Sequence, residues 1–293
     1  MTDHEKYFFD LTGYLVVKQL LSPEDTARLL AAAEKLEAHV SEHVDREPSF
    51  VGKFYIRYHH DPALGYNSYK STAGGLQLIV DDFFNASAAF DVLIDHKRSM
   101  EYVHELSPGP HHIGSGEIRY RYRGNYTPTH MGGPIDHRNR YEFLGRAVLD
   151  PLSGQRPHRD FNLLTVRILY ALHDIEMDQG PLCVVPGTHK ANFPSPYGDD
   201  PSDEPGMIGI PLKAGDAILF TENLRHAGFP NLRDEARKTI HMMFSPTWVG
   251  SQSPAHWNAG VYITQDTYDR YTPAQRALFC RSTPGVLARP GRD

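Results

Sequence analysis

Apolar residues recur at three- and four-residue spacing in two stretches of the first third of the chain, a pattern typical of helices with one buried face. The first stretch begins at Pro23, with Ser22 as its N-cap and the proline at the first helical position. The second runs over residues 86–106 and is followed by a Ser-Pro-Gly-Pro stop. Ahead of both, residues 8–17 indicate a short helix, a turn at Gly13 and a strand. The pattern therefore predicts a helical scaffold near the N-terminus.

From Ile113 onward the pattern changes to short runs rich in Tyr, Val, Ile, Leu and Thr, separated by Gly, Pro, Asn and Asp. This punctuation is typical of a protein built from many short strands. The predicted strands are residues 117–123, 163–173, 182–185, 209–212, 217–220 and 239–244. We find no internal repeat and no low-complexity linker, so the sequence predicts a single domain over residues 1–293.

Strict alternation in the sequence Arg-Tyr-Arg-Tyr-Arg over residues 119–123 predicts a strand with an aromatic face and a cationic face. Two interpretations remain open. We favour a half-buried strand whose arginine face is solvated, and the alternative is that the arginines face the substrate.

Composition restricts the class of partner. The chain has 293 residues, 40% of them hydrophobic and 23% charged, and a formal net charge of −6 without a dense Lys/Arg block. These values are ordinary for a globular protein and do not indicate nucleic acid or an anionic membrane as a partner. Two cysteines are too few for a disulfide framework, and residues 1–17 lack the pattern of a secretory signal. We expect a cytoplasmic monomer or homodimer that binds a small molecule.

The chain contains 17 histidines, and neutral imidazole is the commonest metal ligand in proteins. His158 and Asp160 are two residues apart, so on a strand both side chains lie on one face. A distant third ligand, His226, would complete a set of two imidazoles and one carboxylate. This set is the facial triad of non-haem iron(II) oxygenases, which leaves coordination positions open for other ligands.

Arg237 follows His226 by eleven residues, and the intervening segment has the composition of a hairpin loop. We therefore expect Arg237 to return on the neighbouring strand. Its planar guanidinium can bind a carboxylate in a bidentate pair. Arg233 and Lys238 compete for this role, but Arg237 begins a strand-like run whereas Arg233 lies in the loop.

Together these residues resemble the phytanoyl-CoA dioxygenase family of iron(II)- and 2-oxoglutarate-dependent oxygenases. The resemblance covers about residues 8–246 and rests on ordered motifs: the Phe-x-x-x-Gly-Tyr-Leu-Val-Val pattern of residues 9–17, His158-x-Asp160, the Gln-Gly-Pro-Leu-Cys-Val-Val-Pro-Gly-Thr-His-Lys run of residues 179–190, the Gly-Asp-Ala-Ile-Leu-Phe run of residues 215–220, His226 and Arg237. It implies a mainly β protein with flanking helices and a double-stranded β-helix (jelly-roll, cupin-like) core. Residues 247–293 would form a C-terminal extension and a candidate lid.

The resemblance also implies roles for individual residues. His158, Asp160 and His226 would bind Fe(II), and Arg237 would bind the distal carboxylate of 2-oxoglutarate, with dioxygen as the other cosubstrate. Gln155 matches a position that contacts the cosubstrate in several members of the family.

Several departures from the family pattern bear on these roles. Leu182 stands where a hydroxyl residue often occurs, and Thr165 is a candidate substitute that would bind the cosubstrate. Gly228 stands where some members have a serine that assists the arginine. Because Asp160 is retained, halogenation is not expected, since related halogenases replace this carboxylate with a small residue.

The function predicted from these observations is hydroxylation, or another oxidation, of an unactivated C–H bond in a small organic molecule, such as a secondary metabolite. An acyl-CoA is the alternative substrate. The alternative function is a non-catalytic metal-binding jelly roll that acts as a sensor or a binding module. A zinc hydrolase could use the same ligand types, but it would not explain Arg237.

Overall fold

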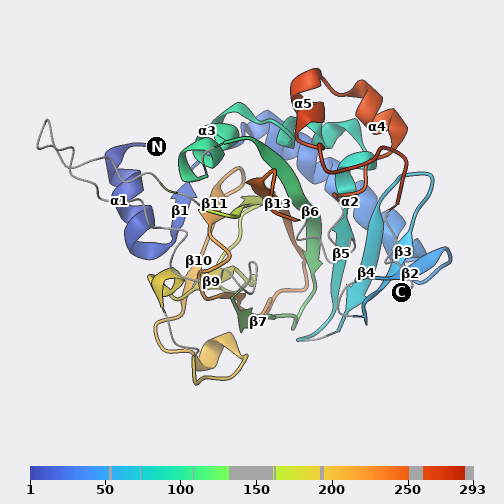
Figure 1. The fold of residues 1–293 in the computed structure, drawn as a ribbon. Coiled ribbons are helices and arrows are strands. Elements are labelled where there is room, and N and C mark those ends of the chain that lie inside the picture. Colours follow the sequence, from blue (N-terminus) through green and yellow to red (C-terminus); the bar gives the residue numbers. More distant parts are fainter. Residues whose placement is uncertain are drawn as a thin grey trace, which may run out of the picture.

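The structure of the chain is a computed structural model that describes residues 1–52, 55–72, 74–107, 109–131, 161, 163–191, 195–250 and 260–287. Within these residues the fold is mainly β and consists of two antiparallel sheets that lie across from each other, with helices outside them (Figure 1). This confirms the predicted jelly-roll class.

The larger sheet has nine strands within the described residues. In spatial order they are β1 (Tyr14–Val17), β11 (Ala217–Phe220), β8 (Val166–Ala171), β13 (Arg237–Pro246), β6 (His111–Arg121), β5 (Gln77–Asp81), β4 (Asn67–Ser71), β3 (Arg57–His60) and β2 (Ser49–Val51). The smaller sheet has the order β10 (Ile208–Ile210), β9 (Leu182–Val184), β12 (His226–Gly228) and β7 (Thr127–His130). The predicted strands are confirmed, although β6 and β13 are longer than expected and β8 is shorter.

The first strand is introduced by α1 (Asp3–Thr12), whose N-terminus carries a capping box between Thr2 and Glu5. The helix ends at Gly13, which has φ 82° and therefore adopts a left-handed conformation. A β-carbon at Gly13 would lie 2.4 Å from the Nδ1 atom of His189. Glycine is required here both for backbone conformation and for space.

Helix α2 (Pro23–His43) packs its predicted apolar face against the outer side of the larger sheet. The contact includes Tyr120 on β6, whose hydroxyl donates a hydrogen bond of 2.7 Å to the carbonyl of Ala33. Tyr122 donates likewise to the Glu37 carboxylate at 2.9 Å. The aromatic face of residues 119–123 is thus turned toward α2. Because side chains alternate along a strand, Arg119 and Arg121 point to the other side, between the two sheets.

The predicted helix over residues 86–106 is wrong as a single element. The structure has a 3-10 helix at Ala88–Leu93 and a separate α3 at Lys97–Leu106. His96 interrupts the first and starts the second, because its side chain accepts a hydrogen bond from the Ser99 amide as an N-cap. The apolar residues of both pieces still pack into one core, which is why the sequence pattern is continuous.

Strands β2 to β5 are an element that the sequence analysis did not predict. They extend the larger sheet beyond β6, at the right of Figure 1. The strands are short, and β4 has the sequence Asn-Ser-Tyr-Lys-Ser, which carries no apolar alternation. Pairing with neighbouring strands, rather than local pattern, defines them.

The expected hairpin between His226 and Arg237 is also wrong. β12 belongs to the smaller sheet, whereas β13 pairs with β6 and β8 in the larger sheet. The connecting segment crosses between the sheets and is held by Asn231, whose amide donates to the carbonyls of Arg121 and Glu235. His226 and Arg237 therefore approach the interior from opposite sheets.

The described part of the C-terminal extension contains α4 (Gln265–Arg270) and α5 (Pro273–Ala277). Arg270 binds the Asp91 carboxylate and the Phe84 carbonyl, so these helices are anchored on the scaffold. The lid remains a prediction, since residues 251–259 lie outside the described part. Among the helices that are described, none has the length and apolar character needed to cross a membrane.

Replacing Gly13 with alanine is expected to lower the free energy of unfolding by about 2–4 kcal/mol, because it combines left-handed strain with a steric clash against His189. Gly124→Ala is the matched control. Gly124 has φ 81° but no atom within 4 Å of the added β-carbon, so only the strain of about 1–2 kcal/mol applies. Urea unfolding measures both, and equal losses in the two variants would contradict the proposed clash.

Candidate active site

The structure describes some of the predicted site residues but not others. His226, Arg237 and Thr165 are described, whereas Gln155, His158 and Asp160 lie outside the described residues. Within the described part, no group of three or more His, Cys, Asp or Glu side chains could hold a metal ion. The predicted metal triad therefore stays a prediction, and the described part of the site consists of His226, Arg237 and their neighbours.

His226 is the first residue of β12 and is paired with His130 on β7 and Val184 on β9. The His226 Nδ1 atom is 2.7 Å from the Leu224 carbonyl, so Nδ1 carries the proton and donates it. Burial, reinforced by the neighbouring His130, lowers the pKa of His226 to about 3. The imidazole is therefore neutral at pH 7, with the lone pair of Nε2 available to a metal.

A cavity of about 40 Å³ lies between the two sheets and has His226 in its wall. Most of its lining is charged or polar, which is unusual for the interior of a jelly roll. The lining residues are Arg119, Arg121, Thr127, His130, Arg167, Leu169, Leu182, Phe220, Glu222, His226, Ala227, Arg237 and His241.

Arg237 is 1% exposed and projects into this cavity from the start of β13. Its Nη1 donates to the Gly180 carbonyl at 2.8 Å and its Nη2 donates to the Thr239 hydroxyl at 2.9 Å. Its Nε is buried and has no hydrogen-bond partner among the residues that the structure describes. Burial and the nearby Arg119 lower the pKa of Arg237 to about 9, so the guanidinium remains charged at pH 7.

Arg121 is a second buried guanidinium that the sequence analysis did not assign to the site. It lies directly across from Arg237 in the β6–β13 register and is 2% exposed. The guanidinium donates to the Gly180 and Phe229 carbonyls and to the Thr127 hydroxyl, and its Nε has no partner among the described residues. The favoured expectation of a solvated arginine face is wrong for Arg119 and Arg121, which turn inward because α2 occupies the tyrosine face, and it holds for Arg123, which is exposed and pairs with Asp234.

The absence of a side chain at Gly228 makes room for the guanidinium of Arg121. A β-carbon at Gly228 would lie 2.1 Å from Nη1 of Arg121, so any side chain there would displace the guanidinium. Some members of the family have a serine at this position that assists the arginine. In this structure Arg121 fills that space instead.

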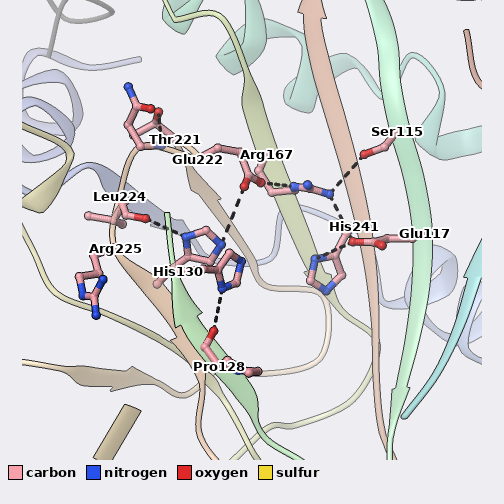
Figure 2. Close-up of polar contacts among 12 residues, drawn as sticks. Ser115, Glu117, Pro128, His130, Arg167, Thr221, Glu222, Leu224, Arg225 and His241 are labelled. Carbon is pink, nitrogen blue, oxygen red and sulfur yellow. Dashed lines mark hydrogen bonds and ion pairs between the residues drawn. The ribbon is translucent and has the colours of Figure 1, made fainter. Parts of the chain in front are cut away.

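A chain of ion pairs in the same cavity wall includes Glu117, Arg167 and Glu222 (Figure 2). Glu117 on β6 accepts hydrogen bonds from Arg119 and from Arg167 on β8. Arg167 also donates through Nε to Oε1 of Glu222 at 2.6 Å. Although burial opposes ionisation, Arg167 lowers the pKa of Glu222 to about 2. The other Glu222 oxygen, Oε2, lies 3.9 Å from His226 Nε2.

Two further histidines belong to this cavity, although their sequence spacing indicated no role. The His130 ring packs on that of His226 with 4.2 Å between centroids. His241 lies 3.0 Å from the Thr239 hydroxyl, and burial together with the surrounding arginines lowers its pKa far below the usual value. His130 reaches the cavity because β7 pairs with β12. His241 reaches it because it lies four residues after Arg237, on the same face of β13.

Thr165 is fully buried and its hydroxyl has no hydrogen-bond partner among the described residues, but it is not among the residues that line the cavity. Its role as a cosubstrate ligand stays a prediction. His189, the histidine of the residue 179–190 motif, lies in a 3-10 turn at Thr188–Lys190, against Gly13.

The fold and the cavity define a jelly-roll protein whose interior holds a neutral histidine and two guanidinium groups that form no ion pair with a carboxylate of the described residues. The sequence profile of the phytanoyl-CoA dioxygenase family matches residues 9–239, and the chain belongs to this family. No curated protein sequence matches the chain.

Solved structures with the same fold include HygX from Streptomyces hygroscopicus, determined with nickel and 2-oxoglutarate bound. It has a TM-score of 0.63 and 21% sequence identity, and the match covers 93% of this chain and 95% of HygX. The non-heme alpha ketoglutarate dependent epimerase SnoN from nogalamycin biosynthesis has a TM-score of 0.57 and 19% identity, with 86% of this chain and 85% of SnoN covered. The carbocyclase SnoK of the same biosynthesis has a TM-score of 0.53 and 15% identity, with 84% of each chain covered.

Arg167→Met is expected to lower the free energy of unfolding by about 3–5 kcal/mol, because it leaves the buried Glu222 carboxylate without its cation. The double variant Arg167→Met/Glu222→Gln should recover part of the loss. Lys213→Met, which breaks an exposed pair with Asp174 and Glu176, should leave the free energy of unfolding nearly unchanged, because water screens this pair. Chemical denaturation tests all three, and a loss below about 1 kcal/mol for Arg167→Met would contradict the ion-pair chain as a stabilising element.

Proposed function

We propose that the protein is an Fe(II)- and 2-oxoglutarate-dependent oxygenase that oxidises a C–H bond of a small organic molecule, with hydroxylation as the default outcome. The observation that carries this proposal is the pair Arg121 and Arg237. Both guanidiniums are buried and neither forms an ion pair with a carboxylate of the described residues, so a dianionic ligand is the natural compensation.

2-Oxoglutarate fits this demand, since it has a carboxylate at each end. Arg237 would bind the distal carboxylate through its fork, and Arg121, across the register, would stabilise the same charge. The Nε–H groups of both arginines have no partner among the described residues and are available to it as donors. HygX and SnoN, which share the fold, were crystallised with this compound, and this supports the assignment.

His226 has the properties of a metal ligand. Its Nδ1–H is fixed by the Leu224 carbonyl, which orients the ring and keeps Nε2 unprotonated. With His158 and Asp160 it would hold Fe(II) in a facial triad. When bound, the iron supplies the oxidation of 2-oxoglutarate by dioxygen and the attack on the C–H bond.

The residues of the chain contribute position and charge to this reaction. Arg237 and Arg121 orient the cosubstrate from the larger sheet, while His226 belongs to the smaller sheet, so the two ends of the cosubstrate would be held by opposite walls. The apolar neighbours Leu169, Leu182 and Phe220 restrict water in the cavity. Retention of Asp160 still predicts that halogenation does not occur.

More than one reaction is possible at the substrate carbon. SnoN is an epimerase and SnoK is a carbocyclase, and HygX was crystallised with hygromycin B, so this fold serves different reactions of secondary metabolites. We propose a secondary metabolite as the substrate here. An acyl-CoA, as in the family's name, is the alternative.

Arg237→Met should raise the dissociation constant for 2-oxoglutarate by about 100-fold, and Arg121→Met by about 10-fold, because each removes a buried cation from the carboxylate site. Arg233→Met is the matched control, since Arg233 is an exposed loop residue paired with Asp178. Isothermal titration of the nickel-loaded protein measures these constants. Unchanged affinity in both buried-arginine variants would place the cosubstrate elsewhere.

Succinate formation tests turnover. Wild-type protein loaded anaerobically with Fe(II) should release succinate slowly after air and 2-oxoglutarate are admitted, even without the true substrate. Asp160→Ala and Arg237→Ala should reduce this rate at least about 100-fold while their circular dichroism spectra are unchanged. If the wild type binds iron and 2-oxoglutarate but releases no succinate with any substrate mixture, the protein is a binding or sensing jelly roll.

A further inference from the structure

The arginines that line the cavity fall into two electrically different sets. Arg121 and Arg237 have no carboxylate partner among the described residues. Arg119 and Arg167 meet two carboxylates, Glu117 and Glu222. An anionic ligand is therefore favoured beside the first set, while the second set is already close to neutral and gains nothing from a further anion.

Glu222 is the member of this balanced set that both lines the cavity and adjoins His226. Only its Oε1 atom is used by Arg167. Its Oε2 atom forms no hydrogen bond with any residue described by the structure, and its 3.9 Å separation from His226 Nε2 is too long for one. An ionised carboxylate oxygen in a buried wall needs a donor, and the described protein supplies none.

His130 offers a second acceptor beside the first. Its Nδ1 lies 2.7 Å from the Pro128 carbonyl, so Nδ1 carries the proton and Nε2 is an acceptor. The ring packs against His226 and is exposed at the cavity wall. Figure 2 shows Glu222 and His130 approaching the same region, His130 from β7 and Glu222 from the turn that precedes β12. Glu222 and His130 thus form an acceptor pair that flanks the predicted metal ligand.

We propose that Glu222 Oε2 and His130 Nε2 bind O–H or N–H donors of the substrate next to the carbon that is oxidised. This inference rests on the proposed function, because it places the substrate beside His226. The chemical class that fits is a polar ring compound with hydroxyl or amino groups, such as an aminocyclitol or an amino sugar. The acyl chain of an acyl-CoA has no O–H or N–H donor to offer these acceptors.

The test is binding rather than turnover. Nickel- and 2-oxoglutarate-loaded protein is titrated calorimetrically with hygromycin B, 2-deoxystreptamine and myo-inositol as donor-rich rings, and with phytanoyl-CoA as the comparator. We expect at least one donor-rich ring to bind the wild type. Glu222→Gln should weaken that binding by about 10-fold, and His130→Phe, which retains a ring against His226 and removes Nε2, by about 5-fold.

Glu204→Gln is the matched control. Glu204 is likewise a buried carboxylate held by an arginine, Arg225, at 2.6 Å, but it does not line the cavity. Its variant should bind the ring as the wild type does. If Glu222→Gln fails to fold, His130→Phe alone carries the test, since its residue is exposed.

The outcomes are separable. Ring binding that neither variant weakens, or binding of phytanoyl-CoA without any donor-rich ring, would overturn the acceptor pair while 2-oxoglutarate still binds. Failure of the wild type to bind 2-oxoglutarate would instead overturn the proposed function, and the acceptor pair with it.

Discussion

Four guanidinium groups lie between the two sheets, and this is the constraint on which the rest of the structure depends: Arg121 and Arg237 are buried, and Arg119 and Arg167 are partly buried. A buried charge is costly unless it is paired and hydrogen-bonded. Arg119 and Arg167 meet that condition with Glu117 and Glu222, whereas Arg121 and Arg237 have carbonyl and hydroxyl partners alone among the described residues. Local features follow from this arrangement. The Gly180 carbonyl is shared by both unmatched arginines, and Gly228 lacks a side chain where Arg121 passes.

The same arrangement gives the cavity two kinds of binding group. An anion is favoured beside Arg121 and Arg237, and a hydrogen-bond donor is favoured beside Glu222, so the proposed cosubstrate and the proposed substrate would not compete for the same groups. His226 lines the same cavity, with its proton on the nitrogen that faces Leu224. The two sheets contribute different groups to the cavity. Arg121 and Arg237 extend from the larger sheet, and His226 and His130 extend from the smaller one.

Sequence patterns predicted the elements whose signal is local. Helix α2 and strand β11 agree with their periodicity, and the family motifs were enough to place Arg237 inside the site. What the patterns could not show is which element covers which face. Alternation in residues 119–123 revealed two faces, but only the docking of α2 on the tyrosines decides that Arg121 turns inward. The connection from His226 to Arg237 had the composition of a hairpin, yet it crosses between sheets. Glu222 and His130 carried no recognisable spacing, because their meeting depends on the long-range β7–β12 pairing.

An epimerase and a carbocyclase share this fold, so the fold alone does not select the fate of the substrate. Under the proposed function, the outcome depends on the hydrogen bonds that fix which C–H bond faces the metal, since a misplacement of about 1 Å is enough to change the rate by two orders of magnitude. In this chain the groups suited to that task are Glu222, which Arg167 holds, and His130, which the Pro128 carbonyl holds. The proposed acceptor pair, rather than the arginine anchor, would therefore determine substrate selectivity.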